Sequence, residues 1–269
     1  MKNWITLICI WTVMLSINPI AYAVEKQVAI TIDDLPFVGS ANYNPGNLRR
    51  EHDRFMKMLA AIKDRGVPAT GFVVAGTIEK GQWDMLNEFA NAGLEVGNHT
   101  YSHPNLYSTA TERYIKDIDK ADKVLKPILT KPKFFRYPYL AEGRGEKKEK
   151  VLSFLHQKGY IIAPVTIDSK DFRFNDRLFS INWRNRPQHL PKIKQQYLSY
   201  IWQQTKRAER ISEKNGKPIK EILLIHANLI NAHAMGDIID MYQKKGYKIV
   251  PLRDILLPSS IAKMPIASE

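Results

Sequence analysis

Short apolar runs alternate along this chain with longer segments in which apolar residues recur every three or four positions. Short runs are typical of buried strands, and the longer pattern is typical of amphipathic helices. We expect strands at Gln27–Ile32, Ala69–Val74, Glu95–Gly97, Phe134–Arg136, Ile161–Ile167, Glu221–His226 and Lys248–Val250. We expect helices at Leu48–Arg65, Gln82–Ala92, Thr111–Leu129, Glu146–Lys158, Pro191–Asn215 and Gly236–Lys245. This alternation predicts an α/β domain with a parallel sheet, either closed as a barrel or open and doubly wound.

Two segments depart from the alternation. Residues Arg173–Arg186 mix Arg, Asn and aromatic side chains without a clean period, which predicts a loop inserted after the fifth strand. The tail beyond Pro258 is expected to be poorly ordered. A length of 269 residues permits one large domain or two small ones, and one large domain is the simpler interpretation.

The first residues have the pattern of a signal peptide. Lys2 provides the positive start, the apolar run Trp4–Leu15 follows, and Ala21–Ala23 has the small-x-small form of a cleavage site. An uncleaved membrane anchor is the alternative, but the apolar run is short for a membrane span. Cleavage near Ala23 would remove Cys9, the single cysteine, and would exclude disulfides and cysteine chemistry from residues 24–269. We therefore expect a secreted or periplasmic protein.

The chain is strongly basic, with 40 Lys and Arg residues against 27 Asp and Glu residues and a formal net charge of +13. Such a charge favours acidic partners: an anionic cell envelope, a cell-wall polymer or a nucleic acid. The basic residues are spread along the chain, so solubility is the simpler explanation. The signal peptide argues against a nucleic acid as the working partner.

Two adjacent carboxylates, Asp33 and Asp34, end the first apolar run. In parallel α/β folds the carboxyl ends of the strands are where active sites form. One carboxylate of such a pair can bind a cation while the other accepts a proton. Taken alone, however, the pair is more typical of a turn or a helix cap.

Two histidines, His99 and His103, follow the third expected strand. Residues four apart fall on one side of a helical turn, with about 5–6 Å between their Cβ atoms, which suits two imidazoles on one divalent ion. Two surface histidines are the alternative. Together with one aspartate, the pair gives two histidines and one carboxylate, a common catalytic metal set with open positions for water and substrate.

Three further polar signals lie at the ends of other strands. Arg136 can pair with a carboxylate and orient it. His226 can donate a proton to a leaving group, and a nearby carboxylate would raise its pKa and fix its tautomer. The third signal is the polar cluster from Asp168 to Asp171, which also ends a strand. Each signal alone is as well explained by a structural role, but a barrel brings all five strand ends together.

In this order, the five segments resemble the five motifs of the polysaccharide deacetylases, the carbohydrate esterases of family 4 with a NodB-homology domain. The resemblance runs from about Gln27 to Leu257. It implies a distorted (β/α) barrel of about seven parallel strands, extending over residues 24–269 as one catalytic domain. It also implies hydrolysis of N- or O-acetyl groups on a polysaccharide such as peptidoglycan, a chitin-like glycan or acetylated xylan.

The resemblance assigns roles to individual residues. Asp34, His99 and His103 match the metal ligands, Asp33 the general base and Arg136 the residue that pairs with the base. His226 matches the general acid, and Asp171 matches the carboxylate that supports it. Tyr139 matches the position whose backbone N–H stabilises the oxyanion, and Leu224 matches a residue of the acetyl-methyl pocket. One divalent ion is implied, with zinc as the default and cobalt or nickel as alternatives. We expect a monomer.

Three positions depart from the family pattern. Ile32 replaces the usual aromatic residue before the two aspartates, Leu140 stands where many members have glycine, and Phe172 stands where many have tryptophan. The last two line the site in the family, so these departures bear on substrate preference rather than on the chemistry. Two alternatives remain: the same site acting on a non-carbohydrate amide, and a carbohydrate-binding relative without turnover.

The segment Arg173–Arg186 is also expected to contribute to substrate binding. It follows a strand whose end carries Asp171, so it must leave from the catalytic face. Phe174, Phe179 and Trp183 suit stacking on sugar rings. We therefore expect this segment to form one wall of the substrate groove, with Phe172 and Trp183 among the binding residues. A solvated loop without function is the alternative.

Overall fold

The computed structural model describes residues 25–38, 44–79, 81–257 and 267–268. The expected signal peptide, its cleavage site at Ala23 and Cys9 lie outside these residues, as does most of the tail beyond Pro258. No helix in the described residues is both long and apolar enough to span a membrane.

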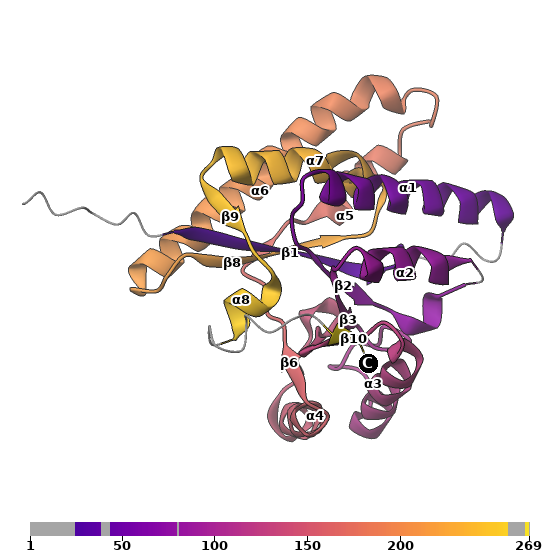
Figure 1. The fold of residues 1–269 in the computed structure, drawn as a ribbon, viewed down its shortest axis with the longest axis vertical. Helices are drawn as coiled ribbons and strands as arrows, with labels where there is room; N and C mark the ends of the chain where they lie inside the picture. Colours follow the sequence, from indigo (N-terminus) through magenta and orange to yellow (C-terminus); the bar gives the residue numbers. More distant parts are fainter. Residues whose placement is uncertain (1–24, 39–43, 80, 258–266, 269) are drawn as a thin grey trace, which may run out of the picture.

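A curled sheet of parallel strands organises the fold (Figure 1). Seven strands follow the order β6-β5-β3-β2-β1-β8-β7, and β9 pairs with the beginning of β1. The bounds are β1 Lys26–Leu35, β2 Thr70–Val73, β3 Glu95–Asn98, β5 Lys133–Phe135, β6 Tyr160–Ile162, β7 Ile167–Asp168, β8 Lys220–His226 and β9 Tyr247–Ile249. A separate antiparallel pair joins β4 Thr130–Lys131 to β10 Ala267–Ser268. The expected α/β fold of about seven parallel strands is confirmed.

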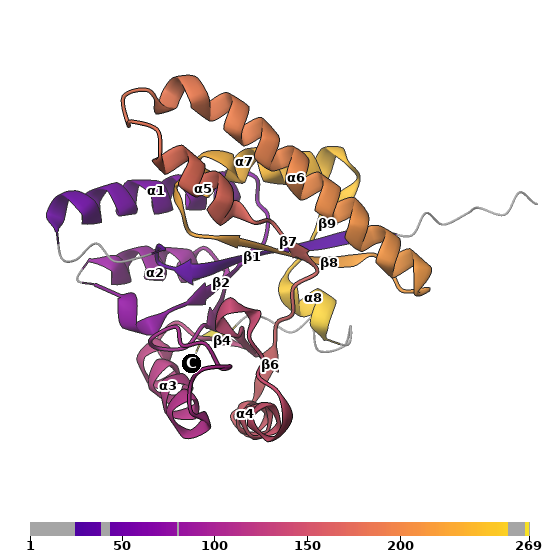
Figure 2. The ribbon, with the colours of Figure 1, turned by 180° about the vertical axis from the view of Figure 1, so that it is seen from behind.

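The helices are α1 Pro45–Asp64, α2 Gln82–Asn91, α3 Thr111–Leu125, α4 Gly145–Gln157, α5 Asp171–Phe179, α6 Arg186–Lys214, α7 Leu229–Lys244 and α8 Leu252–Leu256. Short 3-10 turns lie at Ala75–Thr77 and Pro138–Leu140. Helices α5, α6 and α7 gather on one side of β1 and β8, while α3 and α4 lie beside β3 and β6 at the other end of the molecule (Figure 2).

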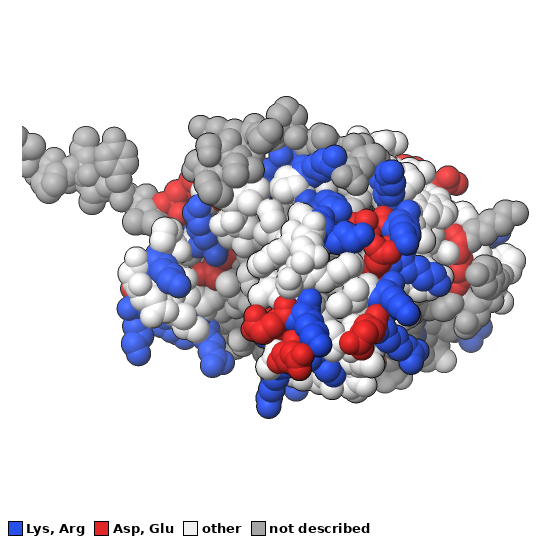
Figure 3. Space-filling view, turned by 90° about the horizontal axis from the view of Figure 1, so that it is seen from below, with Lys and Arg blue, Asp and Glu red and all other residues white. Residues whose placement is uncertain are grey.

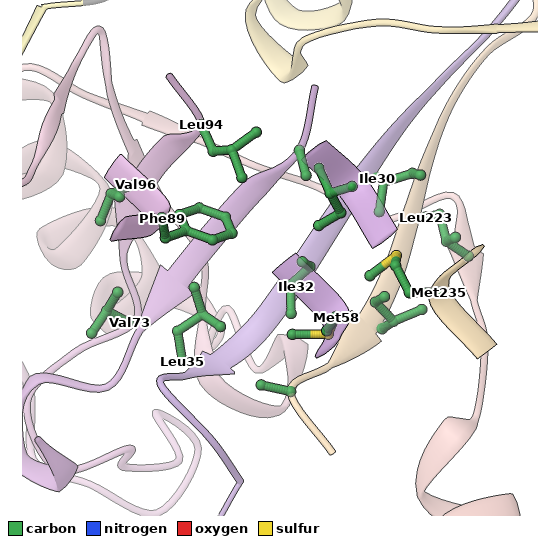
Figure 4. Packing of buried hydrophobic residues seen from close by; sticks show 14 of the residues in the cluster. Ile30, Ile32, Leu35, Met58, Val73, Phe89, Leu94, Val96, Leu223 and Met235 are labelled. Atoms are coloured by element: carbon green, nitrogen blue, oxygen red, sulfur yellow. The ribbon is translucent and has the colours of Figure 1, made fainter. Parts of the chain in front are cut away.

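The side chains of β1 alternate between two apolar clusters, as expected for a strand buried on both faces. Ile30 and Ile32 point to the large cluster between sheet and helices, where Met58 of α1 and Met235 of α7 also pack (Figure 4). Ala29 points the other way, into a small cluster inside the curled sheet, which includes the buried ring of Phe72. Hydrophobic burial on both faces fixes the register of β1 and hence the position of the residues at its end.

The apolar run expected as one strand at Ile161–Ile167 is two strands, and that prediction is wrong. Strand β6 pairs with β5, whereas β7 pairs with β8 on the opposite side of the sheet. Residues 163–166 cross between them, and Pro164 cannot donate a ladder hydrogen bond. The periodicity alone could not show that one run contributes to both ends of the curled sheet.

The segment Arg173–Arg186, expected as a loop, is helical over most of its length. Helix α5 covers residues up to Phe179, and α6 already begins at Arg186. Phe174 and Leu178, four positions apart, pack on the core, so one buried face is enough to hold this short helix. The prediction was wrong because two other apolar side chains of the segment, Phe179 and Trp183, are exposed and obscure the helical period.

Three further helix boundaries differ from the sequence prediction. Helix α3 ends at Leu125 rather than Leu129 because Pro127 lacks the N–H that would continue it. Helix α6 starts at Arg186 rather than Pro191. Helix α7 starts at Leu229 rather than Gly236, since its first two turns are buried on nearly all sides and show no amphipathic pattern.

Candidate metal centre and catalytic pocket

The end of β1 bends sharply and turns both aspartates toward the same space. The pairing of β1 with β2 shifts register between Ile32 and Leu35, and Asp34 has a left-handed backbone with φ 60°. Asp33 remains paired with the end of β8 through its register with His226. A bulge of this kind re-aims a side chain that would otherwise point to the opposite face. The two carboxylates therefore approach the same imidazole, His99 Nε2, at 3.7 Å and 3.6 Å.

The two histidines meet through a turn that is not helical. The segment 99–103 has left-handed residues at Thr100 and His103, so the expected helical turn is wrong. The imidazole rings nevertheless lie 4.9 Å apart between centroids. Asp117 of α3 holds the turn by accepting hydrogen bonds from the backbone N–H groups of Tyr101 and Ser102, at 2.8 Å and 2.9 Å. The rings are thus placed by a hydrogen-bonded turn rather than by helical spacing.

Asp34, His99 and His103 bring one ligand atom each within 4.8 Å of one another. Asp34 Oδ1 is buried, has no hydrogen-bond partner among the described residues, and lies 3.3 Å from His103 Nε2. The Nδ1 atom of His99 lies 2.8 Å from the carbonyl oxygen of Arg136. Because a carbonyl only accepts, Nδ1 must carry the proton, which leaves the Nε2 lone pair facing Asp34. The donor set fits a divalent cation of the zinc type.

The protonation states also fit a cation site. Burial raises the pKa of the Asp34 carboxyl, but the close contact with His103 and the charges of His99 and His226 lower it to about 2. Burial lowers the pKa of the His99 imidazole, although Asp33 and Asp34 oppose this effect. At neutral pH the site therefore offers a carboxylate and a neutral buried imidazole, the forms that bind metal.

We expect about one equivalent of divalent metal per chain after loosely bound ions are removed. His99→Ala combined with His103→Ala should lose it, because one carboxylate alone rarely retains a transition metal ion. Elemental analysis of the purified proteins provides the measurement, and His189→Ala, an exposed histidine of α6, is the matched control. Unchanged metal content in the double variant would place the ion elsewhere.

Asp33 is buried against Arg136, whose side chain fills the inside of the curled sheet. Arg136 Nη1 donates to Asp33 Oδ1 at 2.9 Å and to Thr31 Oγ1 at 2.6 Å. Its other nitrogens donate to the carbonyls of Ala163 and Pro164, both at 3.2 Å, in the segment that crosses from β6 to β7. The guanidinium is therefore fixed from two sides, and it fixes one oxygen of Asp33 while the other faces His99.

His226 is held by Asp171 at the start of α5. The imidazole Nδ1 lies 2.8 Å from Asp171 Oδ1, and the backbone N–H of His226 donates to Oδ2 at 2.7 Å. Burial alone would lower the pKa of the His226 imidazole, but the carboxylate of Asp171, with those of Asp33 and Asp34, raises it to about 10. His226 is therefore protonated at neutral pH, with its Nε2–H directed away from Asp171.

Sequence reasoning missed two residues that complete this arrangement. The side-chain amides of Asn228 and Asn231 donate to Asp171 Oδ2 at 2.9 Å and 2.6 Å, and Asn228 Oδ1 caps α7 by accepting from the Asn231 N–H. With these donors, buried Asp171 stays fully hydrogen-bonded. An Asn-x-x-Asn spacing directly after the strand that ends at His226 was the available signal.

A pocket of about 490 Å³ brings most of the expected site residues together. The expected residues that line it are Asp33, Asp34, His99, His103, Tyr139, Phe172, Leu224 and His226. Arg136 and Asp171 lie behind Asp33 and His226 rather than on the pocket wall. Trp183 does not line this pocket but an adjacent one, so the structure separates it from the other expected binding residues.

Two of the three departures from the expected motif pattern, Leu140 and Phe172, lie on the rim of this pocket, whereas Ile32 is buried in the core. Leu140 has φ 54° and is exposed, and Tyr139 before it has φ 58°. A backbone in this region favours glycine, which explains why glycine suits position 140 and why leucine there is strained. Helix α5 contributes Phe172, Asn175 and Asp176 to the same rim, so part of the Arg173–Arg186 segment lines the pocket.

Comparison with known proteins adds independent information. A family model described as polysaccharide deacetylase matches residues 22–162. A peptidoglycan-N-acetylglucosamine deacetylase of Bacillus cereus is 30% identical over 169 residues, which cover 61% of this chain and 54% of that protein. The chain thus spans about half the length of this relative.

Solved structures share the fold. A peptidoglycan N-acetylglucosamine deacetylase, in complex with 4-naphthalen-1-yl-N-oxidanyl-benzamide, aligns with TM-score 0.58 and 23% identity over 87% of this chain and 90% of that one. A CE4 family pseudoenzyme from Bacillus anthracis aligns with TM-score 0.59 and 17% identity over 87% of this chain and 66% of that one. At these identities the similarity concerns the fold alone, and it includes a relative without activity.

Proposed function

The chain belongs to the polysaccharide deacetylase family, and from this premise we propose that it is a metal-dependent hydrolase that removes N- or O-acetyl groups from a polysaccharide. A peptidoglycan or chitin-like N-acetylglucosamine glycan is the substrate class that its relatives favour. The observation that carries the proposal is one pocket lined by Asp33, His226 and the three candidate ligands Asp34, His99 and His103. A binding protein would not need a paired base and a charged imidazole beside a cation site.

Asp34, His99 and His103 would hold the cation, with zinc as the first candidate and cobalt or nickel as alternatives. Such an ion supplies Lewis-acid polarisation of the acetyl carbonyl and acidification of water. The bend at Asp34 and the turn at residues 99–103 place the three ligand atoms within 4.8 Å of one another.

Asp33 would act as the general base. Arg136 fixes Oδ1 of Asp33 by a hydrogen bond, so Oδ2 is the oxygen available to accept a proton from water. Asp33 and Arg136 are both almost fully buried. A general base needs one oriented carboxylate oxygen that is not itself bound to the metal. Oδ2 of Asp33 meets this requirement.

His226 would act as the general acid. Asp171 binds Nδ1 and leaves Nε2–H to protonate the departing nitrogen or oxygen of the sugar. The backbone N–H of Tyr139, a residue that also lines the pocket, is the proposed donor to the developing oxyanion. Leu224 and Phe172 supply apolar surface for the acetyl methyl group and the sugar ring.

Asp171→Asn should move the alkaline limb of the pH–rate profile to lower pH. The acid works only while His226 is protonated, and its activity is lost as pH rises through the pKa of His226, which is about 10. Removal of the Asp171 charge lowers that pKa, so protonation is lost earlier. The pH dependence of kcat/KM measures this shift, and an alkaline limb that stays in place would contradict the role of Asp171.

Residues 1–23 are proposed as a cleaved signal peptide, which would place the protein in the periplasm or outside the cell. A glycan substrate in the cell envelope agrees with that location and with the positive charge of the chain. Amino-terminal sequencing of the exported protein tests the proposal, and a mature protein that starts near Val24 is the expected result.

An acetate-release screen over purified glycans tests the proposed reaction. Peptidoglycan, chitin oligomers and acetylated xylan distinguish N- from O-acetyl substrates, and small non-carbohydrate amides serve as the comparison set. We expect release from at least one glycan. Release from small amides alone would indicate a different substrate class, and binding to a glycan without release would indicate a non-catalytic relative.

A further inference from the structure

A second pocket opens beside the catalytic one, and the two share the side chains of Val38, Asn175 and Asn228. The second pocket is the larger, about 790 Å³ against about 490 Å³. Its walls come from α1, from α5 and the residues after it, and from the beginning of α6. A chain of sugars that places one unit beside Asp33 can therefore continue into this second pocket.

The second pocket is basic, with Arg50 and Arg54 of α1 facing Arg186 of α6. Glu51 is the carboxylate among its lining residues. In the described part of the chain, none of the three guanidinium groups forms an ion pair with a carboxylate. Burial, and after it the positive charges of Arg50 and Arg186, lower the pKa of Arg54, while the charge of Glu51 opposes this shift.

Another face of the molecule provides a comparison. On the face that carries α3 and α4, Lys and Arg side chains lie interspersed with Asp and Glu (Figure 3). Lys158 pairs there with Asp119 at 2.6 Å, and Lys148 pairs with Glu142 at 2.7 Å. These two lysines form direct ion pairs, whereas Arg50, Arg54 and Arg186 form none with the residues that the structure describes, and Glu51 is the carboxylate that lines the pocket with them.

The arginines are also held in position. The ring of Phe179 lies between two of them, 5.6 Å from Arg54 and 4.9 Å from Arg186, measured from guanidinium carbon to ring centroid. Arg186 Nε donates to the carbonyls of Leu178 and Ile181 at 3.1 Å and 3.0 Å. A guanidinium fixed in this way loses little conformational freedom when it binds an anion.

Aromatic surface lies beside the positive charge. The Trp183 side chain is 65% exposed and that of Phe179 is 44% exposed, although both line the pocket. Exposed aromatic rings in a concave polar site suit the apolar face of a sugar ring, because the ring offers area without losing hydrogen bonds. Charge and stacking surface together indicate a charged carbohydrate rather than a simple ion.

We propose that the second pocket binds an acidic sugar unit of the glycan, whose carboxylate or phosphate group pairs with Arg50, Arg54 and Arg186. The neighbouring N-acetylated unit then occupies the catalytic pocket. Planar guanidinium groups match the two oxygens of such an anion, and the shared wall at Asn175 and Asn228 keeps the two units adjacent. This proposal rests on the proposed function and narrows the substrate to an anionic glycan.

Binding measurements on matched oligosaccharides test the proposal. The probes are chitotetraose, carboxymethylated chitotetraose and phosphorylated chitotetraose, with dissociation constants measured by calorimetry on Asp33→Asn, in which turnover should be slow. We expect an acidic form to bind about tenfold or more tightly than the neutral form, as one charge-assisted contact allows. The acidic probe with the larger preference identifies the anion as carboxylate or phosphate.

Arg50→Gln, an exposed position, and the double change Arg50→Gln with Arg54→Gln should reduce this preference stepwise, the double change by about tenfold. Arg49→Gln is the matched control, since it removes the same charge from an exposed position of α1 outside the pocket, and it should leave the preference unchanged. Equal binding of all three probes, or a preference that survives the double change, would overturn the proposal. If the wild-type protein releases acetate from none of the probes while the preference follows the arginines, the proposed function fails and the anion site stands.

Discussion

Asp33→Asn should lower kcat by about 10²–10⁴ on any acetylated substrate while the metal content stays at that of the wild type. The change keeps the shape of the side chain and an oxygen that can accept from Arg136 Nη1, but it removes the group that takes a proton from water. Asp34, His99 and His103 are untouched, so the cation site should remain. Kinetics of acetate release combined with elemental analysis measures both effects.

The buried Arg136 guanidinium loses the charge of its partner in this variant, so folding must be checked separately. Thermal unfolding of the wild type and of Asp33→Asn identifies a temperature at which both proteins are folded. The rates of the two proteins are then compared at that temperature. Asp53→Asn, an exposed carboxylate of α1, is the matched control. A variant that is folded, metal-loaded and as active as the wild type would exclude Asp33 as the base.

His226→Ala should slow the hydrolysis of an amide far more than that of an activated aryl ester. An amide leaves as an amine and requires a proton, whereas an aryl ester leaves as a stable phenolate and requires one far less. We expect a loss of about 10²–10⁴ on the amide, the range for removal of an acid–base group. The ratio of amide to aryl-ester activity should collapse in His226→Ala but change little in Asp33→Asn, because both substrates need an activated water.

The comparison of ratios separates an acid from a structural residue. Removal of His226 also takes a partner from the buried Asp171 carboxylate, which could loosen the pocket for both substrates equally. Equal slowing of amide and ester would therefore identify His226 as an oxyanion stabiliser or a structural residue. His189→Ala, an exposed histidine of α6, provides the control for the substitution itself.

The sequence predicted the candidate site more completely than it predicted the path of the chain around the site. Asp33 and Asp34 end an apolar strand, and two such carboxylates can face one cation only if the strand bends, as it does at Asp34. The polar strand ends of a parallel sheet converge whatever the connecting segments do. Residue type and strand position were therefore sufficient to predict that Asp33 and His226 lie close together.

Other features depended on contacts that no local pattern records. The His99–His103 turn is shaped by Asp117, which lies in a separate helix, and not by the helical spacing of the two histidines. The run Ile161–Ile167 was predicted to be one strand because both of its halves are apolar. In the structure the two halves belong to β6 and β7, at opposite edges of the sheet. Long-range pairing, rather than propensity, decided these outcomes.

Titration of acetate release with metal tests the central claim most directly. Protein stripped by a chelator and then dialysed should release no acetate from an N-acetylglucosamine glycan, and activity should rise with added zinc to a plateau near one equivalent per chain. His99→Ala with His103→Ala should show no such rise at the same concentrations. Full activity in the stripped protein, or no acetate from any glycan at one equivalent of zinc, cobalt or nickel, would contradict the account.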